Sequence, residues 1–137
     1  MINRIRGALH ETIKRHPMVA KLSGHKARSS RWPKFEKEWL VDHGTCSACG
    51  GTEKLAVHHV RPFHLFPELE LAKGNVVTLC MGPQECHLKI GHGFSFRRWN
   101  DQVEQDAAIL RHNPDKRPAI ETKAMLRSLE LLSKTTH

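Results

Sequence analysis

Two cysteine pairs frame the middle of this 137-residue chain and restrict how it can fold. Two residues separate Cys46 from Cys49, five separate Cys80 from Cys86, and thirty residues lie between the pairs. A two-residue gap lets a tight turn present both sulfurs to one ion, and zinc takes four thiolates tetrahedrally. The second gap is longer than usual, but it contains a Gly-Pro pair and can close on a metal. We therefore predict a structural Zn²⁺ site, with buried free thiols as the alternative.

The composition indicates one ordinary globular domain. Hydrophobic residues make up 39% of the chain and charged residues 26%, and the length is that of one domain. The sequence has no run of about 18 apolar residues, and its N-terminus is too charged for a secretory signal. We expect no membrane contact and a cytoplasmic location, where cysteines hold metals more often than they form disulfides.

The positive charge is concentrated in the first 40 residues. The net charge is +8, and residues 1–40 carry ten basic and three acidic side chains, which is +7 of it. Such a surface is typical of proteins that neutralise backbone phosphates. The alternative is a solvated helix with a lysine bias. We predict phosphate contacts to DNA from Lys26, Arg28, Arg31 and Lys34.

The apolar pattern predicts an α+β fold. Residues 2–22 have helical spacing broken at Pro17, residues 21–32 indicate a basic arm, and a short helix follows Pro33 and stops at Gly44. Residues 54–60 and 75–80 are β-prone and flank an ordered loop. Helices are expected after Cys86, from Trp99 to Leu110 and from Pro118 to Leu132. On the last helix, one side should carry Ile120, Met125, Leu126, Leu129 and Leu132.

The order of the polar residues between and after the cysteines indicates a chemistry. His58 and His59 lie on the first predicted strand, Asn75 opens the second, and His87 follows Cys86. Phosphodiester hydrolysis with one metal ion uses imidazoles as ligands, another imidazole as base, and an amide to orient that base. An imidazole titrates near pH 6.5, so a neutral histidine is a suitable proton acceptor at working pH.

Residues 46–92 resemble the HNH endonuclease motif, with cysteine pairs flanking it as in the zinc-containing branch of that family. The similarity to phage and bacterial HNH proteins extends over about residues 28–100. It implies a ββα-metal (His-Me finger) core at residues 44–95, with a basic helical segment at 1–43 and helices at 96–137. It also implies a DNA endonuclease that acts in a bacterial cell or a phage-infected host.

The resemblance assigns roles to individual residues. It implies that His58 and His87 ligate a catalytic Mg²⁺, Mn²⁺, Ni²⁺ or Zn²⁺ and that His59 is the general base. It also implies that Asn75 holds the loop and orients His59. Arg61 is placed to contact a phosphate beside the metal, with an exposed salt bridge as the alternative.

Two features depart from the simple pattern. The third ligand of the family lies four residues after the helix histidine, which here is Gly91. His92 lies about 140° around an ideal helix from His87, so it can join only if the helix ends or bulges at Gly91. We expect His92 as third ligand, with water as the alternative. Because neighbouring strand residues point to opposite faces, we also expect irregular backbone at His58 and His59.

Two other functions fit part of the sequence. A non-catalytic zinc-stabilised nucleic-acid-binding module explains the cysteines and the basic segment, but not the histidines in catalytic order. A Cys-x-x-Cys oxidoreductase should open a helix beside a βαβ core, whereas a Gly-Gly turn follows Cys49. The sequence leaves the oligomeric state open.

Overall fold

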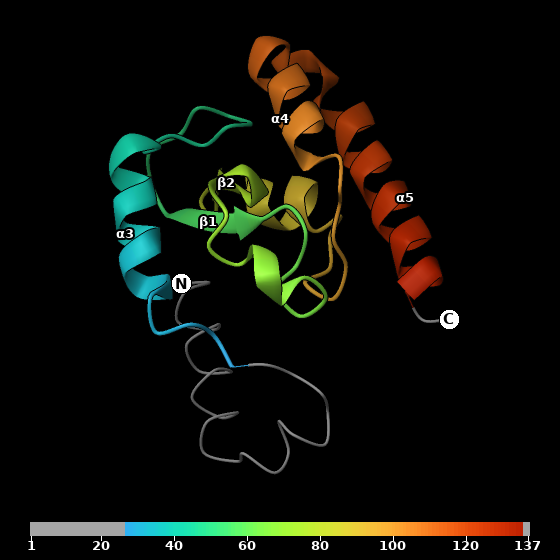
Figure 1. Ribbon diagram of the computed structural model, residues 1–137. Coiled ribbons are helices and arrows are strands. Elements are labelled where there is room, and N and C mark those ends of the chain that lie inside the picture. The colour runs from blue at the N-terminus through green and yellow to red at the C-terminus, as the bar shows by residue number, and fades with distance from the viewer. Residues whose placement is uncertain (1–26, 136–137) are drawn as a thin grey trace.

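The computed structural model describes residues 27–135, which combine helices with one small sheet (Figure 1). The predicted α+β class is confirmed. The predicted helix over residues 2–22, with its break at Pro17, lies outside the described residues. The helices and strands are α3 (Trp32–Asp42), β1 (Leu55–His59), β2 (Val76–Cys80), α4 (Val103–His112) and α5 (Arg117–Thr135). A π-helical turn, η3 (His87–Gly91), and short 3-10 turns at Pro67–Leu69, Lys73–Asn75 and Pro114–Lys116 complete them.

The sheet is an antiparallel pair of five-residue strands, and β2 is rich in β-branched side chains. The register runs one to one from Leu55 opposite Cys80 to His59 opposite Val76. The prediction of irregular backbone at His58 and His59 is therefore wrong. His58 and His59 remain on opposite faces of a regular strand, as the pleat requires.

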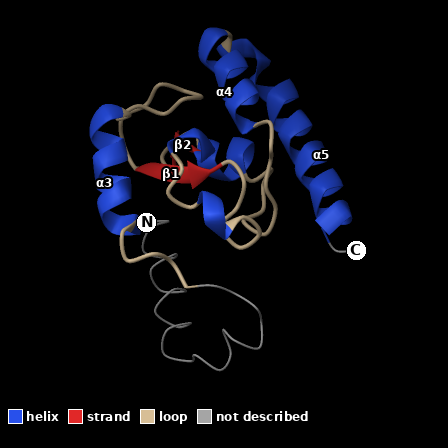
Figure 2. Ribbon diagram, in the orientation of Figure 1, coloured by secondary structure: helices blue, strands red, loops and turns tan. Residues whose placement is uncertain are grey.

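Helix α3 covers one face of the sheet (Figure 2). Trp32 packs there against Val57 and Val76. The indole N–H of Trp39 donates to the hydroxyl of Thr78 over 3.0 Å, and that hydroxyl donates to the carbonyl of His43 over 2.8 Å. These bonds fasten the end of α3 to β2.

The other face of the sheet carries the main core. Figure 1 shows α4 and α5 on the side of the sheet away from α3. The sheet, η3 and these two helices share one apolar cluster that includes Val77, Leu79, Ile90, Val103 and Ile120. This packing places η3 between the sheet and the C-terminal helices.

The buried side of α5 differs from the prediction. Ile120 is buried as expected, but the other buried residues are Ala124, Ser128 and Leu131. The remaining predicted core residues do not belong to the buried stripe: Met125 is half-buried and Leu126, Leu129 and Leu132 are exposed. The physical reason is a close approach. A Cβ on Gly93 would lie 2.7 Å from Ser128 Cβ and 2.8 Å from the carbonyl oxygen of Ala124, so only small side chains fit.

Within residues 27–135, every helix is too short or too polar to cross a lipid bilayer.

Candidate metal centres

The four predicted cysteines converge. Cys46, Cys49, Cys80 and Cys86 bring their sulfurs within 4.8 Å of one another, and all four are free thiols. The sulfurs of Cys49 and Cys80 lie 3.7 Å apart. Tetrahedral zinc with bonds of about 2.3 Å holds its sulfurs about 3.8 Å apart. The cluster therefore has the composition and spacing of a zinc site.

The surroundings favour a thiolate at Cys46, whereas burial raises the pKa of Cys49, and the hydrogen bond to Cys46 raises the pKa of Cys86. The pKa of Cys46 is lowered to about 4, because the Cys86 thiol and backbone N–H groups donate to its sulfur and outweigh burial. The backbone N–H of Gly51 donates to Cys49, and the guanidinium of Arg117 donates to Cys86 over 3.4 Å. Zinc binds cysteine as thiolate, so these donors complement the charge of a loaded site.

Three histidines form a second cluster. His58 from β1, His87 from η3 and His92 after η3 have ring centroids 4.7 to 4.8 Å apart. The Nε2 atoms of His87 and His92 are separated by 3.2 Å, and each ring contributes a nitrogen within 4.8 Å of the others. Two imidazoles on one ion, with bonds of about 2.1 Å, place their nitrogens about 3.0 to 3.4 Å apart. The three rings can therefore hold a divalent cation.

The π turn brings His92 into this cluster. Residues 87–91 form one π-helical turn, and the N–H of His92 donates to the carbonyl of His87, five residues earlier, over 3.1 Å. A π turn advances the chain by one residue more than an α turn for about the same rotation. The predicted end or bulge at Gly91 is confirmed, and His92 takes the place where a regular helix would put Gly91.

Gly91 has a role of its own. A Cβ at this position would lie 3.0 Å from Cε1 and 3.1 Å from Nε2 of His58, and 3.0 Å from Cδ1 of Leu79. The missing side chain thus leaves the space that the His58 imidazole fills. Glycine at this position therefore makes room for the His58 ring and for Leu79, and no positive φ calls for it.

We predict that Gly91→Ala weakens metal binding at the histidine cluster about tenfold or more, because the new methyl group displaces His58. Titration of the zinc-loaded protein with Co²⁺, followed by visible absorption, measures this affinity. Gly74→Ala is the matched control, since a Cβ at Gly74 meets nothing within 4 Å. Equal Co²⁺ affinity in the two variants would show that the histidines do not depend on this space.

Hydrogen bonds orient His92. Its Nδ1 donates to the carbonyl of Arg98 over 2.7 Å, which leaves the lone pair of a neutral ring on Nε2, the atom facing His87. The guanidinium of Arg98 donates to the carbonyl of Gly93 and, over 3.0 Å, to Ser128 of α5. Helix α5 therefore helps to fix the loop that carries the ring.

Asn100, a residue to which the sequence assigned no role, closes the end of η3. It is fully buried, its N–H donates to the carbonyl of Gly91 over 3.1 Å, and its side-chain amide donates to Ile90 over 3.0 Å and to Asp106 over 2.9 Å. Its side-chain oxygen accepts the N–H of Gln102, which forms an Asn turn. This turn explains why α4 begins at Val103 instead of the predicted Trp99. The signal in the sequence was a polar residue directly after a tryptophan.

His59 lies on the α3 side of β1. Its ring stacks on Trp32 with centroids 4.6 Å apart, and its Nε2 is 2.9 Å from the carbonyl oxygen of Glu70. A carbonyl only accepts hydrogen bonds, so Nε2 carries the proton and the lone pair of the neutral ring is on Nδ1. Trp32 and the Glu70 carbonyl were not predicted as neighbours of His59.

Asn75 clamps the loop between the strands. Its side-chain oxygen accepts the N–H of Arg61 over 2.9 Å, and its amide donates to the carbonyls of Arg61 and Leu69 over 3.1 and 3.3 Å. One end of this clamp lies two residues after His59, and the other lies directly before Glu70. The Asn75 side chain therefore bonds to both segments that surround His59.

The residues predicted to contact DNA differ in their exposure to solvent. Arg31, Lys34 and Arg61 are exposed, and Lys26 lies outside the described residues. Arg28 does not offer its charge to solvent. Its guanidinium pairs with the buried carboxylate of Glu70 at 3.5 Å and lies over the rings of Trp32 and Phe63, and burial lowers its pKa. The reason is the buried Glu70 carboxylate, which holds the guanidinium against the fold.

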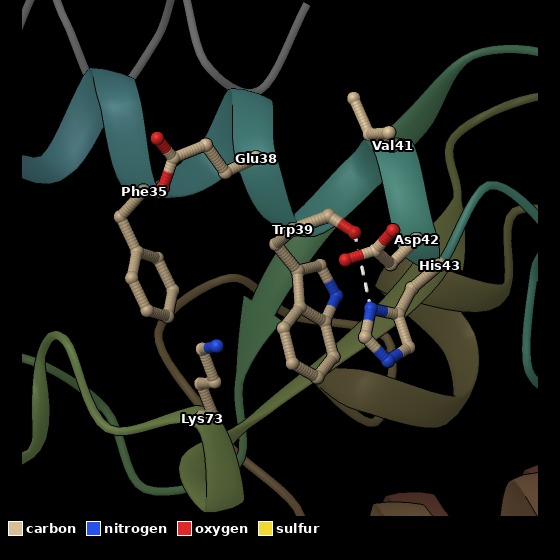
Figure 3. A pocket seen from close by; sticks show the side chains of 7 residues that line it. All are labelled: Phe35, Glu38, Trp39, Val41, Asp42, His43 and Lys73. Carbon is tan, nitrogen blue, oxygen red and sulfur yellow. Dashed lines mark hydrogen bonds between the residues drawn. The ribbon is translucent and has the colours of Figure 1, made fainter.

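A groove of about 360 Å³ lies beside α3 and is separate from both clusters (Figure 3). Its walls include Phe35, Trp39 and Lys73, and Glu38 and Asp42 lie at its edge. His43 also lines it, with its ring stacked on Trp39 at 3.6 Å and its Nδ1 donating to the Trp39 carbonyl over 3.1 Å. None of the residues that line this groove belongs to the two candidate metal centres.

Comparison with known proteins gives no relative: no family model, curated protein or solved structure matches this chain.

Proposed function

We propose that this protein is a metal-dependent DNA endonuclease of the HNH type, which hydrolyses phosphodiester bonds with one catalytic divalent ion and His59 as general base. The observation that carries the proposal is the convergence of His58, His87 and His92. The first of them directly precedes His59 in the chain. In this proposal β1, β2 and η3 are the ββα-metal core, and the four cysteines hold a structural Zn²⁺ next to it.

The three clustered histidines are the ligands of the catalytic ion. Such an ion supplies charge stabilisation for the pentacoordinate phosphate and for the departing 3′-oxygen. The Arg98 carbonyl supports ligation by His92, because it holds the proton on Nδ1 and leaves Nε2 as donor atom. Asn100 supports it from the other side by fixing the end of η3.

His59 accepts the proton of the attacking water on Nδ1. The bond from Nε2 to the Glu70 carbonyl selects the tautomer for this role, and the stack on Trp32 fixes the plane of the ring. Asn75 keeps the Glu70 segment and the end of β1 in register. General bases that are oriented in this way typically contribute a factor of about 10² to 10⁴ to the rate.

The opposite orientation of His58 and His59 suits a hydrolytic site. Their Cα atoms are about 3.8 Å apart, but their rings leave β1 on different sides. A phosphate lying across the end of β1 can contact an ion held on one side while water approaches from the other. Arg61, exposed just beyond this strand, is placed to contact a neighbouring phosphate.

A cleavage assay on supercoiled plasmid tests the proposal. The zinc-loaded protein should nick the plasmid when Mg²⁺, Mn²⁺, Ni²⁺ or Zn²⁺ is added, and His87→Ala should remove both nicking and Co²⁺ binding at the cluster. His43→Ala is the matched control, because His43 lies in the groove beside α3. A non-catalytic DNA-binding module would instead retard the plasmid and leave it intact with every metal.

A further inference from the structure

Two phenylalanines are exposed in the loop that follows His92, and one of them contacts the histidine cluster. Phe94 is 41% exposed and Phe96 is 54% exposed, although phenylalanine is normally buried. The ring centroid of Phe96 lies 5.0 Å from that of His92 and 5.7 Å from that of His87. Two exposed aromatic rings within three residues of the chain indicate a contact surface next to the candidate metal site.

The loop that carries these rings is held in a costly conformation. Phe94 has a φ of 75°, in the left-handed region that favours glycine and disfavours a bulky side chain. Gly93 before it is packed against Ser128, and Arg98 after it donates to both Gly93 and Ser128. The fold therefore fixes Phe94 in a strained position without burying its ring.

Positive charge accompanies the rings. Arg97 is exposed directly after Phe96, and Arg61 is exposed with its guanidinium over the ring of Phe66 at 5.4 Å. Phe66 in turn packs on Trp99, two residues beyond Arg97. Exposed aromatic rings combined with cations match a nucleic acid strand, which offers base faces for stacking and phosphates for charge.

We propose that Phe94 and Phe96 form a stacking platform for unpaired nucleobases next to the scissile phosphate, so that the substrate is single-stranded or locally unpaired DNA. This inference rests on the proposed nuclease function. Paired bases of a duplex stack on one another and hide their faces, whereas every unpaired base exposes a π-face. A rigid platform at the metal site therefore selects strands whose bases are free to stack on it.

Phe94→Gly is the decisive variant. It removes one ring and relieves the left-handed strain, so the melting temperature should stay the same or rise. Affinity for a fluorescein-labelled oligothymidylate should fall about tenfold, while affinity for a duplex of equal length should not change. Fluorescence anisotropy measures both, on zinc-loaded full-length protein in a His59→Ala background that prevents cutting. Leu126→Ala is the matched control, because Leu126 is 58% exposed on α5.

Phe96→Leu is a second variant. Its Co²⁺ affinity is measured as well, because Phe96 contacts two of the histidine rings. Weaker binding of the oligothymidylate with unchanged Co²⁺ affinity supports the platform. If both variants lose single-strand and duplex affinity equally, the rings contact duplex DNA and the proposal is wrong. Unchanged affinity for the oligothymidylate in both variants also overturns it. Tighter binding of an oligouridylate than of the oligothymidylate overturns DNA as the occupant.

The two proposals fail in distinguishable ways. If unmodified protein nicks plasmid but Phe94→Gly binds the oligothymidylate normally, the platform is wrong and the nuclease stands. If Phe94→Gly loses single-strand binding but unmodified protein cuts neither plasmid nor single strands with any metal, the nuclease is wrong and the rings serve binding alone.

Discussion

His59→Ala should lower the rate of metal-dependent DNA cleavage by about 10² to 10⁴, the range that a positioned general base contributes. The ring that is lost donates from Nε2 to Glu70 and keeps the Nδ1 lone pair for the proton of water. Because His58 leaves β1 on the other face and the remaining two rings of the histidine cluster come from η3 and the residue after it, Co²⁺ affinity should stay close to that of the unmodified protein. Plasmid nicking and Co²⁺ absorption, measured on one protein preparation, check the two parts of this expectation.

His43→Ala serves as the control for a general effect of losing an imidazole, since His43 stacks on Trp39 and not on Trp32. Cleavage at an undiminished rate in His59→Ala would remove the base assignment while leaving the metal site intact. Parallel loss of cleavage, Co²⁺ binding and thermal stability would mean that His59 holds the fold through Trp32 and Glu70.

Removal of the zinc should unfold the described domain. Structural zinc binds finger peptides with about 10 to 16 kcal/mol at neutral pH, and a domain of this size is typically stable by only about 5 to 15 kcal/mol. The four sulfurs join the loop after α3, the end of β2 and the start of η3. Without the ion, the four thiols no longer cross-link these segments, and the pairing of β1 with β2 is no longer stabilised at its end. Thermal melting followed by circular dichroism, with rising concentrations of a zinc chelator, measures the effect.

Cys49→Ser should reproduce the effect of the chelator, whereas His87→Ala should lose the catalytic ion and keep its melting temperature within a few degrees. An unchanged melting transition after complete removal of zinc would contradict a structural role for the cysteine cluster. A similar loss of stability in His87→Ala would show instead that the histidine cluster carries the stability.

Local patterns were enough to predict the sheet and the cysteine cluster, whereas the composition of the histidine cluster was implied by the resemblance to HNH endonucleases. Two short β-prone segments on either side of an ordered loop predicted β1 and β2, and the cysteine spacing predicted the sulfurs that the structure brings together. The end or bulge at Gly91 followed from that resemblance together with helix geometry, because the family's third ligand falls on Gly91, which has no side chain, and His92 is one residue too far along.

Features set by long-range contact could not be predicted in the same way. The apolar residues of α5 suggested a core side with Leu126 and Leu129, but the tight approach of Gly93 selects Ala124 and Ser128 instead. Arg28 looked like a phosphate ligand because its partner Glu70 is 42 residues away in the sequence. In both cases the deciding atoms belong to a segment far away in the sequence, and local periodicity carries no information about such contacts.

The two candidate metal centres are linked directly through Cys86 and His87, which are neighbours in the chain. One peptide bond joins a residue of the sulfur cluster to a residue of the imidazole cluster, and its planarity keeps their Cα atoms about 3.8 Å apart. Any shift of the backbone at Cys86 is therefore passed on to the ring of His87. A substitution that loosens the cysteine cluster should therefore weaken Co²⁺ binding at the histidine cluster before the chain unfolds, so a loss of Co²⁺ affinity would be an early sign of lost stability.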